Sequence, residues 1–263
     1  MIEIRDLYKS FGGLRVLRGV NLDIQTGETM VVLGRSGTGK SVLLKLIIGL
    51  LPPDRGTIRV DGRDVNTMSY AELGELRKHM GMLFQMAALF DSMTVAENVG
   101  LGLREGRDLT EDQIAAIVAQ KLALVGLQGI EAKKPAELSG GMRKRVGLAR
   151  AVAMNPKYIL YDEPTTGLDP ITARQINILI RELQAKLLVT SIVVTHDLHS
   201  AYQVGDRVCL LHDGRIYFTG TPAEMQETED AVVRQFARGE AEGPMTNGFP
   251  EPVRRGVAGV RGR

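Results

Sequence analysis

The stretch Gly34-Arg35-Ser36-Gly37-Thr38-Gly39-Lys40-Ser41 determines the fold class of this chain, because it fits the phosphate-binding pattern G-x-x-x-x-G-K-[ST]. The apolar run Thr29-Met30-Val31-Val32-Leu33 precedes it, and we expect the run 41–51 that follows to be helical. A strand, a glycine-rich loop and a helix in this order form the context in which the pattern binds phosphate. An ordinary glycine-rich turn explains neither this context nor the Lys-Ser ending.

The chemistry of this loop predicts a phosphorylated ligand. Gly34, Gly37 and Gly39 allow consecutive backbone N–H groups to turn toward an anion, and the following helix directs its positive end to the same place. Lys40 is expected to reach the β- and γ-phosphates, and the Ser41 hydroxyl to bind Mg²⁺. All eight residues of the loop are therefore candidate nucleotide contacts.

A second motif, Leu138-Ser139-Gly140-Gly141-Met142, is another serine and glycine pair at the expected start of a helix. Such a helix start binds anions in the same way as the first loop. Ser139 precedes Asp162 by 23 residues, and the basic residues Arg143, Lys144 and Arg145 follow the motif. In its sequence and its position in the chain, the motif resembles the signature sequence of the ATP-binding cassette (ABC) ATPases.

The resemblance to ABC ATPases implies an α/β fold of the P-loop NTPase type over residues 1–238. It has a RecA-like core, an antiparallel β layer and a helical subdomain at about 87–155 that carries the signature. The resemblance also implies that the chain binds and hydrolyses ATP with Mg²⁺. Two copies would form a head-to-tail homodimer, in which Ser139, Gly140 and Gly141 of one copy close over the γ-phosphate held by the other.

Two acids and a histidine follow predicted strands. Asp162 and Glu163 come after the apolar run 158–161, and because neighbouring strand residues point to opposite faces, we expect them to have different roles. The resemblance implies that Asp162 binds Mg²⁺ through a water molecule and that Glu163 is the general base. It also places Asp169 at the dimer interface and His196, after the expected strand 189–195, near the γ-phosphate.

Gln85 and Phe11 complete the predicted pocket. Gln85 ends the strand-like run Met82-Leu83-Phe84-Gln85 and resembles the family's glutamine that senses Mg²⁺ and the γ-phosphate. Phe11 occupies the position of the aromatic residue that stacks on adenine, and its ring supplies the required π-face. Tyr8 is the rival candidate, although its distance from the Gly12-Gly13 turn fits less well.

The composition suits a globular domain: the chain has 263 residues, of which 44% are hydrophobic and 24% charged. The net charge of +2 gives no argument for a nucleic-acid partner. The longest apolar stretch, Val42 to Leu51, is interrupted by Lys45 and is too short to span a bilayer. We expect no leader peptide, and the single cysteine, Cys209, indicates a reducing compartment.

Periodicity and turn residues predict the remaining elements of a single cassette without internal repeats. The expected segments are strands at 1–33 and 55–66 in an antiparallel layer, a helix at 67–80, mainly helical structure at 87–155, an amphipathic helix with Ile176, Leu179, Ile180, Leu183 and Leu187, a hairpin at 206–218, and a helix at 222–238. Asp61-Gly62 and Asp213-Gly214 indicate hairpin turns, and Gly239 is expected to end the last helix.

A narrower resemblance concerns the cargo. The run Leu89 to Val99, the wording Ser139 to Arg145, and Val233-Arg234-Gln235-Phe236 followed by Gly243-Pro244 are similar to the MlaF-like ATPases of Mla (maintenance of lipid asymmetry) transporters, which are MCE-type systems. This implies phospholipid transport with an integral membrane permease, a periplasmic MCE lipid-binding protein and a small STAS-domain protein. The chain would be peripheral, at the cytoplasmic face of the inner membrane.

Three other functions remain open at this point. An ATPase of a polar amino-acid or other small-solute importer is the first alternative, because the ATP site does not report the cargo. A non-transport ABC protein is disfavoured because only 122 residues, without heptads, separate Lys40 from Asp162. The signature disfavours a metabolic kinase.

Two surfaces are candidates for contact with partners. Met68, Met80, Met82, Met86 and Met93 surround Gln85 and form either a socket for the permease's coupling helix or ordinary filling of the core. The extension 239–263 is rich in glycine and proline, so it is either a solubilising end or a segment that docks on a partner. We favour docking, because apolar residues recur along it: Met245, Phe249, Val253, Val257 and Val260.

Overall fold

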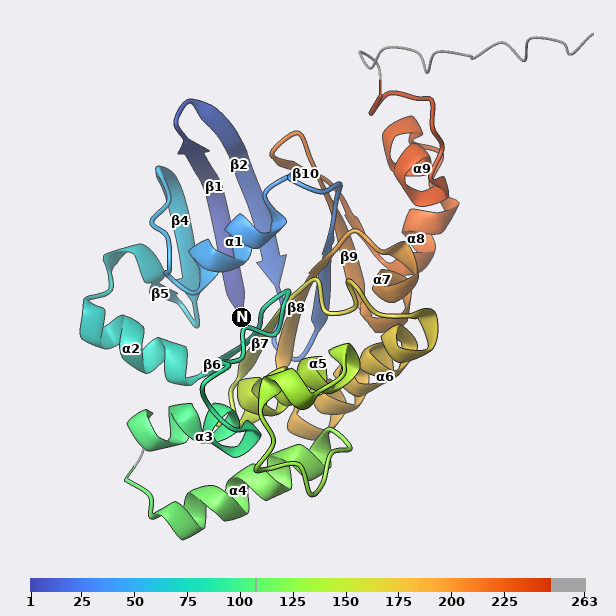
Figure 1. Cartoon of the computed structure of the whole chain (residues 1–263). Helices are drawn as coiled ribbons and strands as arrows, with labels where there is room; N and C mark the ends of the chain where they lie inside the picture. The colour runs from blue at the N-terminus through green and yellow to red at the C-terminus, as the bar shows by residue number, and fades with distance from the viewer. Residues whose placement is uncertain (107, 247–263) are drawn as a thin grey trace, which may run out of the picture.

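The computed structural model describes residues 1–106 and 108–246, which form two β-sheets and a helical lobe (Figure 1). The elements, in chain order, are β1 (Ile2–Phe11), β2 (Leu14–Ile24), β3 (Thr29–Leu33), α1 (Lys40–Ile47), β4 (Arg55–Val60), β5 (Arg63–Asp64), η1 (Val65–Thr67), α2 (Tyr70–Lys78), β6 (Met80–Leu83), α3 (Val95–Gly106), α4 (Glu111–Leu124), η2 (Pro135–Glu137), α5 (Gly140–Val152), β7 (Tyr158–Asp162), α6 (Pro170–Leu187), β8 (Thr190–Thr195), α7 (Leu198–Val204), β9 (Arg207–His212), β10 (Arg215–Gly220), α8 (Pro222–Glu227) and α9 (Ala231–Arg238).

The smaller sheet is antiparallel and has the strand order β2-β1-β4-β5. The turn between β4 and β5 has positive φ at Asp61 (50°) and Gly62 (78°), as a two-residue hairpin of the predicted kind requires. The turn between β9 and β10 has the same form at Asp213 and Gly214. Both predicted hairpins are therefore confirmed.

The larger sheet has the order β10-β9-β3-β8-β7-β6, and only β10 runs antiparallel to its neighbour. Its register places Leu33 beside Thr195 and Leu83 beside Tyr161. Parallel pairing therefore brings the carboxyl ends of β3, β8, β7 and β6 to one edge. The loops that follow these four strands carry Lys40, His196, Glu163 and Gln85.

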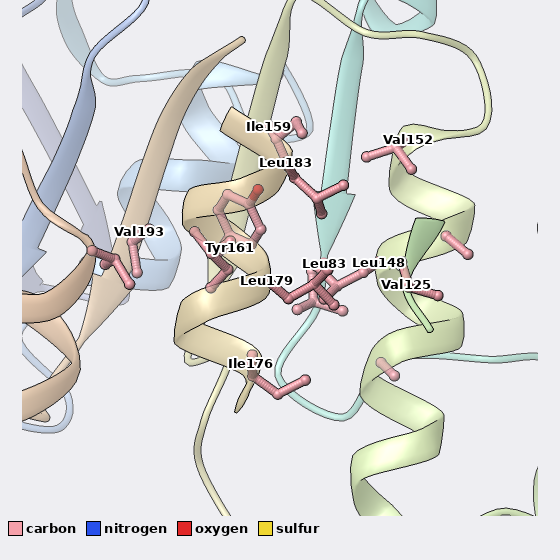
Figure 2. Packing of buried hydrophobic residues seen from close by; sticks show 14 of the residues in the cluster. Leu83, Val125, Leu148, Val152, Ile159, Tyr161, Ile176, Leu179, Leu183 and Val193 are labelled. Atoms are coloured by element: carbon pink, nitrogen blue, oxygen red, sulfur yellow. The ribbon is translucent and has the colours of Figure 1, made fainter. Parts of the chain in front are cut away.

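Both faces of this sheet are buried, and alternate strand residues belong to two separate cores. On β3, Val31 and Leu33 pack into the core beneath the helical lobe, whereas Met30 and Val32 pack with α1 and the antiparallel sheet. Figure 2 shows the first core, where side chains of α5 and α6 meet Leu83 of β6. The sheet is thus fixed from both sides.

The helical lobe holds the signature motif. Helices α3, α4 and α5 pack against one another, as the lower part of Figure 1 shows. Thr110 and Gln113 form a capping box at the start of α4, which fixes where this helix begins. Its apolar face buries Ile114, Val118 and Leu122, and it also buries Lys121, whose Nζ donates to Asn155 Oδ1 at 2.5 Å.

Several predicted boundaries are wrong. Residues 29–33 do not join the antiparallel layer, because β3 pairs with β8 and β9 in the parallel sheet. The helix expected at 41–51 starts at Lys40 and ends at Ile47, since Gly49 adopts a left-handed φ of 67° and Leu50 N–H bonds back to Lys45 O at 2.8 Å.

Helix limits also differ around capping residues. The helix expected at 67–80 begins at Tyr70, because Ser69 and Glu72 form a capping box, and Met80 already belongs to β6. The segment 222–238 contains two helices instead of one, because Asp230 caps a new helix, α9. Gly239, with φ of 65°, ends α9 as predicted.

Leu160 tests the core beneath α1. It lies on β7, is fully buried, and packs in the core with Ile192 and Val194. We expect Leu160→Ala to lower the free energy of unfolding by about 2–5 kcal/mol, since the cavity left behind relaxes only in part. Leu14→Ala, at a residue that is 68% exposed, should change it by less than about 0.5 kcal/mol. Urea denaturation measures both; equal effects would contradict this account of the core.

Candidate functional site

A cavity of about 270 Å³ lies at the edge where the four parallel strands end. The predicted residues that line it are Phe11, Ser36, Gly37, Gly39, Lys40, Ser41, Gln85, Glu163 and His196. They come from five segments far apart in the sequence. Gly34, Arg35 and Thr38 belong to the same loop, and Asp162 reaches the cavity through Ser41. The structure therefore brings together most of the predicted pocket.

The glycine-rich loop owes its shape to its glycines. Gly37 and Gly39 have φ of 80° and 100°, which residues with side chains rarely adopt. A Cβ at Gly39 would lie only 2.6 Å from Val16 Cγ1 of β2, so any other residue would have to displace that side chain as well as strain the backbone. This close approach holds the loop directly over the start of α1.

Lys40 directs its ammonium into this loop. Nζ donates to Gly34 O at 2.8 Å and to Arg35 O at 3.0 Å, and it lies 3.6 Å from Glu163 Oε1. Burial lowers the pKa of Lys40, and the nearby Glu163 carboxylate opposes this shift. A positive charge enclosed by a glycine-rich loop is the arrangement that binds a phosphate group.

Ser41 and Asp162 form the pair expected to hold Mg²⁺. Ser41 Oγ donates to Asp162 Oδ1 at 2.7 Å. Burial raises the pKa of Asp162 and the hydrogen bond from Ser41 lowers it, with burial the larger effect. A hydroxyl and a carboxylate oxygen are the hard ligands that Mg²⁺ prefers, and a bound nucleotide and water would supply the others, so the pair fits this ion.

Glu163 is held by more partners than Asp162. Its Oε2 accepts hydrogen bonds from Thr166 Oγ1 at 3.0 Å and Thr195 Oγ1 at 3.3 Å, and lies 2.9 Å from His196 Nδ1. The two acids diverge for a different reason from the one predicted. β7 ends at Asp162, and Glu163 adopts a left-handed φ of 48°, which turns its side chain into the cavity.

The signature motif lies outside this cavity. Ser139 caps α5 by accepting a hydrogen bond from Met142 N–H at 3.2 Å. A Cβ at Gly141 would lie 2.6 Å from Thr172 Cγ2, at the start of α6, where Asp169 is the N-cap. Ser139, Gly140, Gly141 and Asp169 therefore belong to neighbouring helix starts and do not line the pocket of their own chain.

The adenine candidates differ in what surrounds them. Phe11 is 45% exposed and lines the cavity together with Val16, which no motif marked. A cation lies beside each ring, Lys9 Nζ at 5.4 Å from the centre of Phe11 and Arg55 Cζ at 5.5 Å from that of Tyr8, but Tyr8 does not line the cavity and its hydroxyl lies against Gly19. This geometry favours Phe11 as the stacking residue.

The roles of three residues near the acids were not predicted from the sequence. Thr166 and Thr195 donate to Glu163, and Lys144 of α5 donates to the backbone oxygen of Glu163 at 3.0 Å. Burial lowers the pKa of Lys144 to about 8. The available signal was the lysine itself, because the other buried residues of α5 are apolar or glycine.

The partner surfaces are described only in part. Met80 and Met82 pack against the core, whereas Met86 is 82% exposed. Of the extension, residues 239–246 fold back on their own chain: Met245 N–H donates to Gln235 Oε1 at 2.7 Å, and Arg35 Nη1 donates to Met245 O at 3.3 Å. Phe249, Val253, Val257 and Val260 lie outside the described residues.

The chain belongs to the ABC transporter family, whose sequence profile matches residues 17–166. It is therefore an ABC ATPase that binds ATP and serves as the ATPase subunit of a transporter, as its motifs predicted. This result excludes the metabolic-kinase alternative.

Curated relatives resemble almost the whole chain. It is 46% identical over 244 residues to the probable ribonucleotide transport ATP-binding protein mkl of Mycobacterium tuberculosis (strain H37Rv), covering 93% of this chain and 68% of that protein. It is 40% identical over 250 residues to the intermembrane phospholipid transport system ATP-binding protein MlaF of Escherichia coli (strain K12), covering 95% and 93%.

The solved structures agree with the fold. A dimeric ATP-binding cassette in a post-hydrolysis state, bound to ADP and Pi, matches with a TM-score of 0.78 and 33% identity. The match covers 84% of this chain and 99% of that one. The predicted fold class is thus confirmed.

Asp162 allows a test of the site's electrostatics without nucleotide. Because its native pKa lies above the ordinary value of 3.8, the native state binds more protons than the unfolded state between these two values. Stability therefore falls as the pH rises through this window. We expect Asp162→Asn to raise the urea midpoint at pH 7, and the gain to shrink as the pH is lowered toward 4.

Asp169→Asn is the matched control with the opposite sign. Hydrogen bonds from the Thr172 side chain and backbone lower the pKa of Asp169, so its carboxylate stabilises the native state at neutral pH. This substitution should lower the urea midpoint at pH 7, with a smaller loss in acid. A shift in the same direction for both variants at pH 7 would contradict the assigned pKa directions.

Proposed function

We propose that this chain powers the movement of phospholipid between membranes, as the ATP-hydrolysing subunit of an MCE-type transporter. The observation that carries the proposal is the 40% identity, over nearly the full length of both chains, to an intermembrane phospholipid transport ATPase. A second relative is named for ribonucleotide transport, so that cargo is the alternative that the test must distinguish. No feature of the described site favours an amino-acid importer.

The site residues divide the work of ATP hydrolysis. Lys40 and the loop backbone hold the β- and γ-phosphates, and Phe11 stacks on adenine. Ser41, Gln85 and, through water, Asp162 would hold Mg²⁺, which would neutralise the phosphate charge when bound. These roles are supported because each side chain lies at the cavity or one hydrogen bond from it.

Glu163 is the general base in this proposal, and His196 contacts the γ-phosphate. Glu163 is only 8% exposed, and hydroxyl groups fix one of its oxygens. A carboxylate held in this way can orient a water molecule and accept its proton. His196 lies beside it and reaches the open side of the cavity, since its side chain is 53% exposed.

A second copy supplies the rest of each site. The ABC family works as dimers, and here the exposed Ser139 and the start of α5 lie away from the chain's own phosphate loop. A head-to-tail homodimer would bring Ser139, Gly140, Gly141 and Asp169 of one copy to the nucleotide of the other. Their backbone N–H groups at a helix start suit the γ-phosphate.

The membrane partners follow from the same relationship. No helix within residues 1–106 and 108–246 is long and apolar enough to cross a membrane. The exposed side chains of Met86 (82%) and Phe90 (50%) lie in the segment after Gln85 and provide an apolar contact for an integral permease at the cytoplasmic face of the inner membrane. A periplasmic MCE protein and a small STAS-domain protein complete the proposed complex, and the extension 239–263 docks on one of its cytoplasmic subunits.

Glu163→Gln tests the base and the dimer together. We expect ATP to bind normally and hydrolysis to slow by roughly 10²- to 10⁴-fold, because an amide cannot accept the proton. The ATP that is not hydrolysed should then hold the dimer closed. Size-exclusion chromatography with ATP and Mg²⁺ detects this dimer. Lys40→Ala is the matched control, since it should lose ATP binding and stay monomeric. Hydrolysis by Glu163→Gln at the wild-type rate would overturn the assignment.

Isolation of the complex tests the cargo. The tagged chain, purified in mild detergent from membranes of its own host, should bring with it a permease and an MCE-domain protein. In detergent solution without lipid, added phospholipid should stimulate the ATPase activity of this complex, whereas ribonucleotides other than ATP and amino acids should not stimulate it. Stimulation by a ribonucleotide, or recovery of a soluble solute-binding protein in place of the MCE protein, would contradict the phospholipid assignment.

A further inference from the structure

Helix α5 holds the turn that carries Gln85 through two of its cations. The Lys144 ammonium donates to the backbone oxygen of Gln85. The Arg150 guanidinium donates to the backbone oxygens of Ala87 at 2.6 Å and Ala88 at 2.7 Å. Side chains of one helix thus donate hydrogen bonds to three of the four backbone carbonyl groups in the turn 85–88.

This turn needs external support. Ala87 and Ala88 both have positive φ, 60° and 45°, a conformation that is strained for residues with a side chain. Such a conformation persists only where surrounding contacts impose it. The contacts from α5 therefore support this turn together with its own hydrogen bond, from Ala87 N–H to Phe84 O at 2.8 Å.

Lys144 also supports the backbone of Glu163. Its ammonium donates to Glu163 O at 3.0 Å, while Glu163 N–H donates to Val194 O of β8 at 2.9 Å. Glu163 has a left-handed φ of 48°, so its backbone is held on one side by β8 and on the other by Lys144. A single ammonium joins the two residues proposed to sense and to hydrolyse the γ-phosphate.

A lysine at this position has a cost that packing alone does not offset. Lys144 is only 5% exposed, and an apolar side chain of similar length would avoid the burial of a charge. The ammonium provides up to three donors from one atom, which allows it to bond two carbonyl groups that face each other. Its charge also lies close to the carboxylates of Asp162 and Glu163.

We propose that Lys144 is a positioning residue that couples the signature helix to the chain's own hydrolytic site. This proposal rests on the proposed function of Glu163 and Gln85. Because α5 is one continuous helix, a displacement of Ser139 at its start, when the partner's nucleotide binds there, moves Lys144 with it. Lys144 then aligns Gln85 and Glu163 together, so that hydrolysis in one site depends on occupation of the other.

The test compares two buried lysines. Lys144→Met removes the ammonium and keeps the length of the side chain. We expect kcat for ATP to fall about tenfold or more while the Kd for ATP stays within about threefold, because the loss concerns alignment and not binding. Lys144→Arg retains donors that reach the carbonyl groups and should recover part of kcat.

Lys121→Met is the matched control. Lys121 is also 5% exposed and also lies in the helical lobe, but it bonds Asn155 and does not reach the cavity. We expect this variant to lose thermal stability and to keep the kcat of the wild type. An equal fall of kcat in both variants would show a general effect of destabilisation and overturn the proposal.

Further outcomes decide the case. A kcat for Lys144→Met within about twofold of the wild type, or an arginine variant no more active than the methionine variant, would overturn the proposal. If Lys144→Met does not fold, Lys144→Gln, which keeps one donor group, replaces it with the same expected split between kcat and Kd. A wild-type chain without ATPase activity, or Glu163→Gln at full rate, would instead mark failure of the proposed function.

Discussion

The hydrogen-bond register of the parallel sheet is the constraint on which the remaining structure depends. Thr195 pairs with Leu33, and Leu83 pairs with Tyr161, so four strands end at the same level. A shift by one residue would turn every side chain to the opposite face and move each following loop. The two cores prevent such a shift, because each face of the sheet has its own buried set of residues, one of which Figure 2 shows.

The site at this edge gathers buried charge and backbone strain. Four charged side chains of the site are buried: Lys40, Lys144, Asp162 and Glu163. The backbone of Glu163 also adopts a left-handed conformation. Such features lower stability and persist at functional sites, where the surrounding structure imposes them. Here hydrogen bonds to loop carbonyls and to hydroxyl groups offset much of the cost. The fold thus gathers these charges at the cavity, where electrostatic stabilisation of phosphoryl transfer needs them, and the proposed movement of Lys144 with α5 completes their alignment.

Local signals predicted the elements well and their limits less well. The strand, loop and helix around Gly34 to Ser41 was recognisable because residue types and spacing alone define it. Errors arose where strand pairing or a capping residue decided the outcome. Residues 29–33 joined the parallel sheet because β8 and β9 flank them, and the segment 222–238 divided because Asp230 caps a second helix. Hydrophobic periodicity indicates neither which sheet a strand joins nor where one helix is divided into two.

The sequence by itself determined the family, the phosphate loop and the candidate residues of both half-sites, because each motif is a short run whose backbone chemistry is local. Only the tertiary structure decided how these runs meet. It placed Ser139 away from the loop of its own chain, and it revealed that Lys144 joins Gln85 to Glu163. Residues 59 and 19 positions apart in sequence meet through strand register and helix packing, and no local pattern encodes that distance.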